Sequence, residues 1–441
     1  MVGPRAVGGE TLWVECGLCR APRPLPCSRY LCGRRLRSPR GRLLFRGGLR
    51  ASTHRTSFLM AGLYLHIPFC KQACHYCDFH FSTSLGLKSR LVEALVRELK
   101  LRRDYLPPDT TLDTIYFGGG TPSLLTADEL ARIFAAIHRH FTVAAQAEIT
   151  LEANPDDLST AKLAELRTAG INRLSIGLQS FYEPHLRLMN RAHTAAESTT
   201  AVRRAQDAGF ENLSIDLIYG VPAPGHHIWE ADLANALALS VPHVSAYALT
   251  IEPGTAFGHR LQKGTFRAAP DEFVATQFET LLATLRAHGY GQYEISNFCQ
   301  PGRESRHNAN YWRGVPYLGL GPSAHSYDGE NRQFTLANNP LYVAAVLERG
   351  EVPVTLDPLT ATDRANEYLL TTLRTARGCD LALLRTRHGL DLAATRAPYL
   401  AELHANGWAT IQNEVLTLTD AGKLLADHIT LELFQTPAVA E

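Results

Sequence analysis

The chain has 441 residues with 45% hydrophobic and 20% charged residues, values that are ordinary for a globular protein and exclude a low-complexity or fibrous chain. The formal net charge is +1, but twelve arginines and only two acidic residues fall in residues 1–59, so the rest of the chain is acidic. An acidic body argues against nucleic-acid binding, which favours a basic face. No stretch approaches the roughly 20 apolar residues of a membrane span, so we expect none.

Residues 1–59 are rich in Arg, Gly, Pro and Ser and lack a periodic apolar pattern, so we expect a disordered extension. Either translation begins at Met60, directly before the first apolar run, or the segment is an arginine-rich transit peptide. The nine cysteines of the chain do not form a secreted disulfide pattern, and we expect a cytoplasmic location. A zinc site in the extension is a minor alternative that would use Cys16, Cys19, Cys27 and Cys32.

After Met60, short β runs alternate with helical stretches, which is typical of a parallel sheet covered by helices, either open or closed as a TIM-like barrel. Helix start signals support this pattern, since Thr126 and Ser159 each stand at an N-cap position. The predicted strands are 62–68, 114–120, 148–155, 173–180, 212–220 and 243–250. The predicted helices are 85–104, 126–141, 159–169, 194–208 and 226–239.

Strand parity separates an apolar face from a polar one. In 173–180, Leu174 and Ile176 point one way and Ser175 the other, and the neighbouring strands follow the same rule. The apolar faces suit an outer layer of helices, so the polar faces line the interior of an incomplete barrel. Polar residues also stand near the strand ends where barrel enzymes place their active sites, namely Glu152, Gln179, Asp216 and the glycines 118–120.

Three cysteines in "FCKQACHYCDF" follow the first strand, at Cys70, Cys74 and Cys77. Structural zinc sites are almost always four-coordinate, and cubane iron–sulfur clusters normally take four cysteines. Three thiolates therefore predict a cluster with one iron left open to a ligand that is not protein. Three buried or zinc-binding cysteines are the alternative.

The C-x3-C-x2-C spacing directly after a first strand, together with "GGGTPS" (118–123) after the second, resembles the radical S-adenosylmethionine (SAM) superfamily. The resemblance implies a partial (β/α)6 barrel and a [4Fe-4S] cluster whose open iron binds SAM. It also implies reductive cleavage of SAM to a 5′-deoxyadenosyl radical, which is chemistry of the cofactor.

The segments "YLHIPFC", "YFGGGTPSLL", "RLSIGLQSF" and "SIDLIYGVP" resemble more closely the branch that contains the HemW haem chaperones and oxygen-independent coproporphyrinogen III oxidase. This resemblance implies SAM contacts at Tyr64, Gly119, Gly120, Thr121, Glu152, Gln179, Arg191 and Asp216.

Two features divide the branch. The oxidase carries a further cysteine two residues after the last cluster ligand, where this chain has Phe79, and "HNANYW" (307–312) resembles the HNxxYW signature of the chaperones. We therefore predict a haem chaperone rather than an enzyme with ordinary turnover, the alternative being a porphyrinogen oxidase. The predicted haem ligand is His307, with His325 and Cys299 as substitutes. Alternatively, His307 is a polar core residue.

The resemblance implies haem and an acceptor protein as partners. The sequence leaves the oligomeric state open, with a cluster-dependent homodimer as one option. The domain prediction is 60–260 for the partial barrel, 261–360 for a connecting segment with the HNxxYW motif, and 361–441 for a winged-helix-like domain. In this last domain the sequence predicts helices, a β hairpin with its turn near Asn413, and a final helix over 420–434. Residues 362–434 carry seven basic and nine acidic residues, so DNA binding is not expected.

Overall fold

The computed structural model describes residues 60–435. The predictions for 1–59, a disordered extension and a minor zinc alternative, lie outside the described residues. No helix in the described part is long and apolar enough to cross a membrane.

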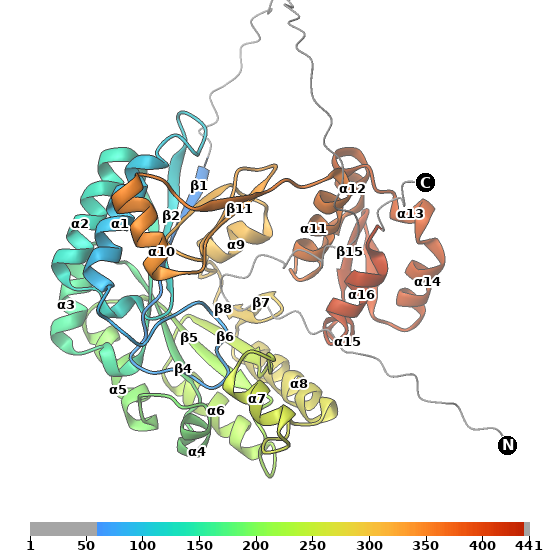
Figure 1. Cartoon of the computed structure of the whole chain (residues 1–441). Coiled ribbons are helices and arrows are strands. Elements are labelled where there is room, and N and C mark those ends of the chain that lie inside the picture. Colours follow the sequence, from blue (N-terminus) through green and yellow to red (C-terminus); the bar gives the residue numbers. More distant parts are fainter. Residues whose placement is uncertain (1–59, 436–441) are drawn as a thin grey trace, which may run out of the picture.

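One mixed sheet of twelve strands organises most of the described chain, and it is not closed (Figure 1). Its order is β12-β11-β10-β9-β1-β2-β3-β4-β5-β6-β8-β7. The six central strands are parallel and confirm the six predicted ones: β1 (Met60–Ile67), β2 (Thr111–Gly119), β3 (Thr142–Ala153), β4 (Arg173–Gln179), β5 (Asn212–Tyr219) and β6 (His243–Ala248).

Helices connect these strands and cover the outside of the sheet, as Figure 1 shows. Both predicted cap residues act as such, because the side chains of Thr126 and Ser159 accept from backbone N–H groups in the first turns of their helices. The helices are α1 (Lys88–Leu101), α2 (Ala127–His140), α3 (Thr160–Thr168), α4 (Glu183–Leu188), α5 (Ala195–Asp207) and α6 (His227–Ala238), and short 3₁₀ turns span Pro122–Leu124 and Pro155–Asp157.

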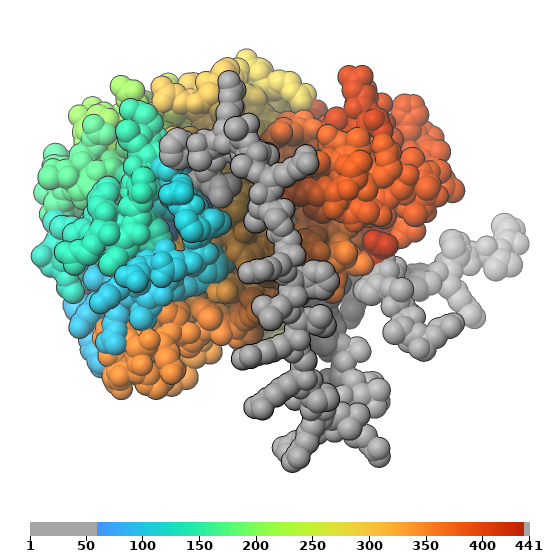
Figure 2. Space-filling view, turned by 90° about the horizontal axis from the view of Figure 1, so that it is seen from above, coloured from blue at the N-terminus to red at the C-terminus, as the bar shows by residue number. Residues whose placement is uncertain are grey.

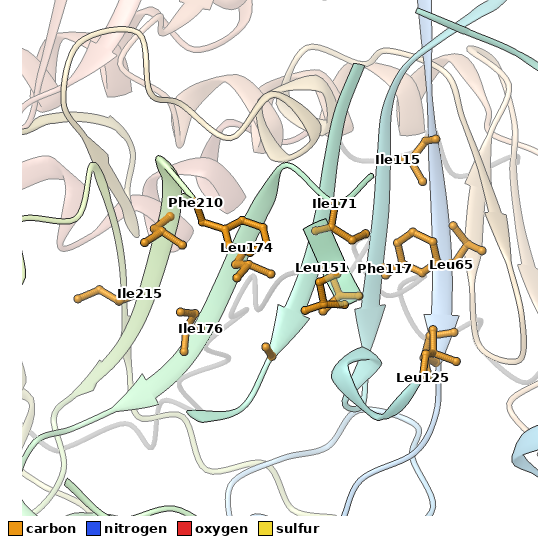
Figure 3. Packing of buried hydrophobic residues seen from close by; sticks show 14 of the residues in the cluster. Leu65, Ile115, Phe117, Leu125, Leu151, Ile171, Leu174, Ile176, Phe210 and Ile215 are labelled. Atoms are coloured by element: carbon orange, nitrogen blue, oxygen red, sulfur yellow. The ribbon is translucent and has the colours of Figure 1, made fainter. Parts of the chain in front are cut away.

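The main core lies between the sheet and these helices. Figure 3 shows apolar side chains of neighbouring strands side by side, including Leu151, Leu174 and Ile176, and all three are fully buried. The opposite face of β4 carries Ser175, which is also buried and bonds to Asp216 of β5. The predicted division into an apolar outer face and a polar inner face is thus present, because side chains alternate along each strand.

Residues 261–360 were predicted to be a connecting segment. In the structure their strands extend the sheet at both ends. Strand β9 pairs with β1 in parallel, and β8 pairs with β6 antiparallel. The strands are β7 (Gly291–Glu294), β8 (Asn297–Cys299), β9 (Tyr317–Leu320), β10 (His325–Tyr327), β11 (Arg332–Thr335) and β12 (Val354–Asp357). The helices in and just before this region are α7 (Ala256–Gln262), α8 (Asp271–Ala287), α9 (Arg306–Trp312) and α10 (Asn339–Ala344). Helix α10 continues into a π turn at Ala345–Arg349.

A smaller unit follows and stands to one side of the sheet (Figures 1 and 2). It has its own buried apolar cluster and a three-stranded sheet of order β13-β15-β14. Asn413 and Glu414 form the predicted hairpin turn with φ of 50° and 60°. The predicted last helix is divided in two. The elements are α11 (Ala361–Leu373), β13 (Cys379–Asp380), α12 (Leu381–His388), α13 (Leu392–Thr395), α14 (Ala397–Ala405), β14 (Ala409–Gln412), β15 (Val415–Leu418), α15 (Asp420–Lys423) and α16 (Ala426–Leu433).

Buried ion pairs attach this unit to the sheet. Arg374, after α11, donates to Glu294 of β7 at 3.1 Å and to Asp427 of α16 at 3.3 Å. Arg332 of β11 donates from Nε to Glu367 of α11 at 2.6 Å. Removing one partner of a buried pair is strongly destabilising, so these contacts fix the small unit in one position.

Candidate functional site

Three cysteines lie on the loop that joins β1 to α1, beyond the carboxyl end of β1. Cys70, Cys74 and Cys77 are partly buried free thiols. The loop turns back on itself, because Cys70 N donates to Ser82 O at 3.0 Å and Cys77 N donates to Cys74 O at 3.3 Å. The predicted cluster ligands therefore share one short, internally bonded loop.

The segment that follows α4 fixes this loop from outside. His75 N donates to Met189 O at 3.0 Å, and the Gln72 side chain donates to Asn190 Oδ1 at 2.8 Å. Asn190 in turn donates to Ala73 O at 2.8 Å. These bonds satisfy polar groups that regular secondary structure would otherwise satisfy, and they give the loop a defined shape.

The glycine turn after β2 packs against the start of the loop. Gly120 N donates to Ile67 O at 3.0 Å, and Thr121 N donates to Phe69 O at 2.7 Å. A Cβ atom on Gly120 would lie only 2.7 Å from Phe69 O. Gly119 has φ of 106°, a conformation that favours glycine. The glycines thus bring the backbone of β2 within contact distance of the cysteine loop.

Arg191 joins the loop to the sheet. Its Nη1 lies 3.3 Å from Cys74 Sγ and 3.2 Å from the Tyr76 hydroxyl, and its Nη2 donates to Asn154 Oδ1 at 2.7 Å and to Gly177 O at 2.8 Å. Its Nε is buried and has no hydrogen-bond partner among residues 60–435. Burial opposes the charge of Arg191, but Tyr76 and Cys74 outweigh it and raise the pKa.

Two of the thiols are kept protonated unless something replaces the proton. Burial raises the pKa of Cys70 to about 11 and that of Cys77 to about 12. Metal ligation needs the thiolate, so iron binding would displace these protons.

Two carboxyl groups lie on the inner face of the sheet. Glu152 accepts from the Tyr116 hydroxyl at 2.8 Å and from Gly119 N at 3.1 Å, and burial raises its pKa to about 8. Asp216 accepts from the Ser175 hydroxyl at 3.2 Å, and burial raises its pKa to about 6. Glu152 stands one residue before the end of β3, whereas Asp216 lies in the middle of β5, deeper than the sequence suggested.

Two further predicted contacts flank the carboxyl groups. The register of β4 with β5 is irregular between Gly177 and Gln179, and Gln179 has φ of 69°, so its side chain folds back over Gly177. On β1 the Tyr64 hydroxyl is bonded to His66 Nδ1 at 3.1 Å. The structure thus gathers most of the predicted site at the carboxyl ends of β1–β4, with Tyr64 and Asp216 deeper in their strands.

The donor set fits a cluster and its ligand. Thiolates are the usual ligands of iron–sulfur clusters, and three partly buried thiols lie beside a buried guanidinium with an unpartnered Nε. Within residues 60–435, no three His, Cys, Asp or Glu side chains are arranged to hold a single metal ion. The close glycine turn leaves room for a ligand to approach the backbone.

The histidine of the HNxxYW motif is buried and hydrogen-bonded, which differs from its predicted role as a haem ligand. His307 is 2% exposed, its Nδ1 is bonded to Thr114 Oγ1 at 2.7 Å, and its Nε2 is bonded to the Tyr311 hydroxyl at 2.9 Å. Burial, with Arg173 nearby, lowers its pKa to about 3. Because both ring nitrogens are used, neither is open to an iron in this arrangement. The structure favours the polar-core alternative for His307.

Of the two substitute ligands, Cys299 is buried and His325 is half-buried. Cys299 is 3% exposed in β8, and burial raises its pKa to about 12. His325 packs against Phe334, and burial lowers its pKa to about 4. Neither residue lines the cavity beside the cysteine loop.

That cavity, of about 710 Å³ and open to the surface, was not predicted from the sequence. The cysteine loop and the segment 252–256 form most of its wall. The signal that could have found it is the "CHYCDF" run (74–79), five of whose six residues line the cavity. These five are Cys74, His75, Cys77, Asp78 and Phe79, and Phe81 of the same loop joins them.

Known proteins are similar to this chain in sequence and in fold. The radical SAM superfamily model matches residues 64–232, and the HemN C-terminal domain model matches residues 359–425. The chain is 34% identical over 374 residues to "Heme chaperone HemW" of Bacillus subtilis, which covers 84% of this chain and 98% of that protein. The chain belongs to the HemW family of radical SAM proteins.

Two other relatives extend this picture. "Radical S-adenosyl methionine domain-containing protein 1, mitochondrial" of Bos taurus is 38% identical over 267 residues, 60% of each chain. The solved structure of coproporphyrinogen III oxidase (HemN) from Escherichia coli superposes with a TM-score of 0.74 at 23% identity, over 86% of this chain and 90% of that one. At this identity the superposition shows a common fold.

Proposed function

We propose that this protein is a haem chaperone that binds haem beside a SAM-ligated [4Fe-4S] cluster and transfers it to an acceptor protein. The observation that carries the proposal is Phe79, which lines the cavity next to Cys77 where the resembling oxidase has a further cysteine. An aromatic side chain there gives an apolar wall suited to a porphyrin. The full-length relation to proteins named haem chaperones supports the same choice.

In this proposal Cys70, Cys74 and Cys77 hold the cluster. Glu152 and Asp216 accept hydrogen bonds from the SAM ammonium or ribose hydroxyls, and Arg191 forms a charge-assisted bond with a carboxylate. When bound, the cluster supplies an electron for SAM chemistry. The chain's own part is to orient SAM by Tyr64, Gly119, Gly120, Thr121 and Gln179 and to keep water from the buried carboxyl groups.

The test is anaerobic reconstitution of protein starting at Met60, followed by haem titration read by absorbance. Coproporphyrinogen III turnover and 5′-deoxyadenosine release are measured in parallel. Saturable one-to-one haem binding without turnover supports the chaperone. Decarboxylation with little haem binding would replace it with the alternative, an oxygen-independent coproporphyrinogen III oxidase-type enzyme.

The compartment and the oligomeric state complete the proposal. The sequence prediction is cytoplasmic, while the arginine-rich residues 1–59 and the bovine relative, whose name includes mitochondrial, favour a mitochondrial address. Fluorescent fusions of the full chain and of the chain from Met60 separate these addresses. Light scattering with and without the cluster tests the expected cluster-dependent homodimer.

A further inference from the structure

The cavity beside the cysteine loop contains a histidine that no prediction had assigned. An axial haem ligand needs a nitrogen lone pair directed into a space large enough for a porphyrin. The cavity volume of about 710 Å³ lies within the range of cofactor sites, roughly 300–1,000 Å³. Of the histidines in residues 60–435, His75 is the one on its wall.

Hydrogen bonding sets the ring of His75 in the form that a metal requires. Its Nδ1 lies 2.8 Å from Leu188 O, and because a carbonyl only accepts, Nδ1 carries the hydrogen. The lone pair is therefore on Nε2, and none of the described residues is hydrogen-bonded to that atom. Histidines that bind metals almost always donate their other N–H in this way.

The ring is also held in place before any ligand arrives. His75 N donates to Met189 O at 3.0 Å, and its carbonyl accepts from Phe257 N at 2.9 Å. The ring meets the Phe257 ring edge-on, with 5.7 Å between centroids. Anchoring on both sides lowers the conformational entropy that ligand binding would otherwise cost.

The remaining wall combines apolar and polar residues. Phe79, Phe81, Pro253 and Ala256 supply apolar surface for a porphyrin, and Asp78, Asn190 and Glu252 are its polar members. The same cavity contains Cys74 and Cys77, so a haem held there would lie next to the cluster.

We propose that His75 is the axial ligand of the haem cargo, bound through Nε2 in the cavity between the cysteine loop and residues 252–256. This inference rests on the proposed function, since it names the ligand of the haem that the chaperone carries. It assigns HNxxYW a structural role and moves haem binding to the "CHYC" run.

The experiment is a haem titration of anaerobically reconstituted protein with His75→Ala, His307→Ala and His404→Ala. His404 is exposed on α14 and provides the matched control. We expect at least a tenfold weaker affinity and a changed Soret band for His75→Ala, with the other two variants within about twofold of the wild type. An unchanged affinity and spectrum in His75→Ala would overturn the assignment while leaving the chaperone function intact.

Two further variants exclude an indirect effect through the cluster. His75→Gly should recover the wild-type Soret band when imidazole is added, which a collapsed loop would not do. Cys77→Ala, which removes a cluster ligand but keeps His75, should retain the histidine-ligated spectrum. If imidazole restores nothing, or if Cys77→Ala reproduces the His75→Ala spectrum, the ligand lies elsewhere. Absence of haem binding by the wild type would instead contradict the proposed function itself.

Discussion

The cysteine loop and helix α9 both stood out in the sequence as cofactor-binding motifs, but the structure builds them in opposite ways. In the loop the backbone is bonded, the three thiols form no disulfide, and His75 Nε2 has no hydrogen-bond partner among the described residues. In α9, by contrast, both ring nitrogens of His307 are hydrogen-bonded inside the core. A motif therefore marks a position, and hydrogen bonding decides whether that position binds a ligand.

The difference has a physical cause. Buried nitrogen and oxygen groups are almost always paired, because an unpaired one costs about 1–3 kcal/mol. The N-terminus of α9 follows the same rule, as Glu148 accepts from both Arg306 N and His307 N. A thiol is only a weak donor and acceptor, so a bond such as that from Arg191 to Cys74 is given up at little cost when a metal binds.

The largest effect is expected when a cysteine of the loop is replaced. Cys74→Ala removes a thiolate that lies against Arg191, so iron and sulfide should fall to background after reconstitution. Metal analysis and the visible absorbance of the cluster measure this. Cys299→Ala, in a buried β8 position away from the loop, should keep the full cluster. Normal iron in Cys74→Ala would remove the loop from the cofactor site.

Replacing His307 of α9 should lower the stability of the protein. His307→Ala leaves Thr114 and Tyr311 without a partner and opens a cavity, so we expect the free energy of unfolding to fall by about 3 kcal/mol. Urea denaturation measures it, with the exposed His404→Ala expected within about 0.5 kcal/mol of the wild type. A strong loss of haem affinity with unchanged stability would instead restore His307 as the ligand.

The regular part of the fold was predictable because its signals are local. The six parallel strands show alternation, and Thr126 forms the capping box with Glu129 that its sequence indicated. The strands in 261–360 were missed because β8 and β10 have three residues each, too few to show a period. They exist through pairing with β6 and β9, which only the folded chain provides.

Within the site, the sequence indicated the types of residue, but not the hydrogen bonds that those residues form. The cysteine spacing indicated a cluster without any knowledge of tertiary structure. The segment after α4 that holds the loop lies more than a hundred residues away, and the sequence gives no sign that Asn190 bonds to Gln72 and Ala73. Burial of His307 and the tautomer of His75 depend on such distant contacts.

A moderate effect is expected in the pH dependence of SAM binding. Glu152 has a pKa of about 8 because it is buried, so in the free protein at pH 6 it is mainly protonated. A SAM ammonium needs the carboxylate, so binding releases a proton and affinity should rise with pH up to about 8, by at most roughly tenfold per pH unit. Equilibrium dialysis with reconstituted protein measures this.

Glu152→Gln is the matched control for that profile, because the amide keeps the shape of the side chain and cannot ionise. Its SAM affinity should be weaker at pH 8 and nearly independent of pH between 6 and 8, apart from the smaller contribution of Asp216, whose pKa is about 6. A wild-type profile that falls with rising pH would contradict the role of Glu152 as an acceptor.

The smallest effect is expected at the rim of the loop. Lys71 is bonded to Asp156 at 2.7 Å and also contacts Asp157, but its side chain is 42% exposed. Exposed ion pairs contribute about 0–1 kcal/mol, so Lys71→Ala should change the unfolding free energy by less than 1 kcal/mol and leave cluster content unchanged. Gln72→Ala, one residue on, removes two bonds to Asn190 that are partly buried and should loosen the loop more, lowering cluster retention under chelator challenge. If Lys71→Ala loses the cluster faster than Gln72→Ala, the loop is held by its surface charges rather than by the contacts beneath it.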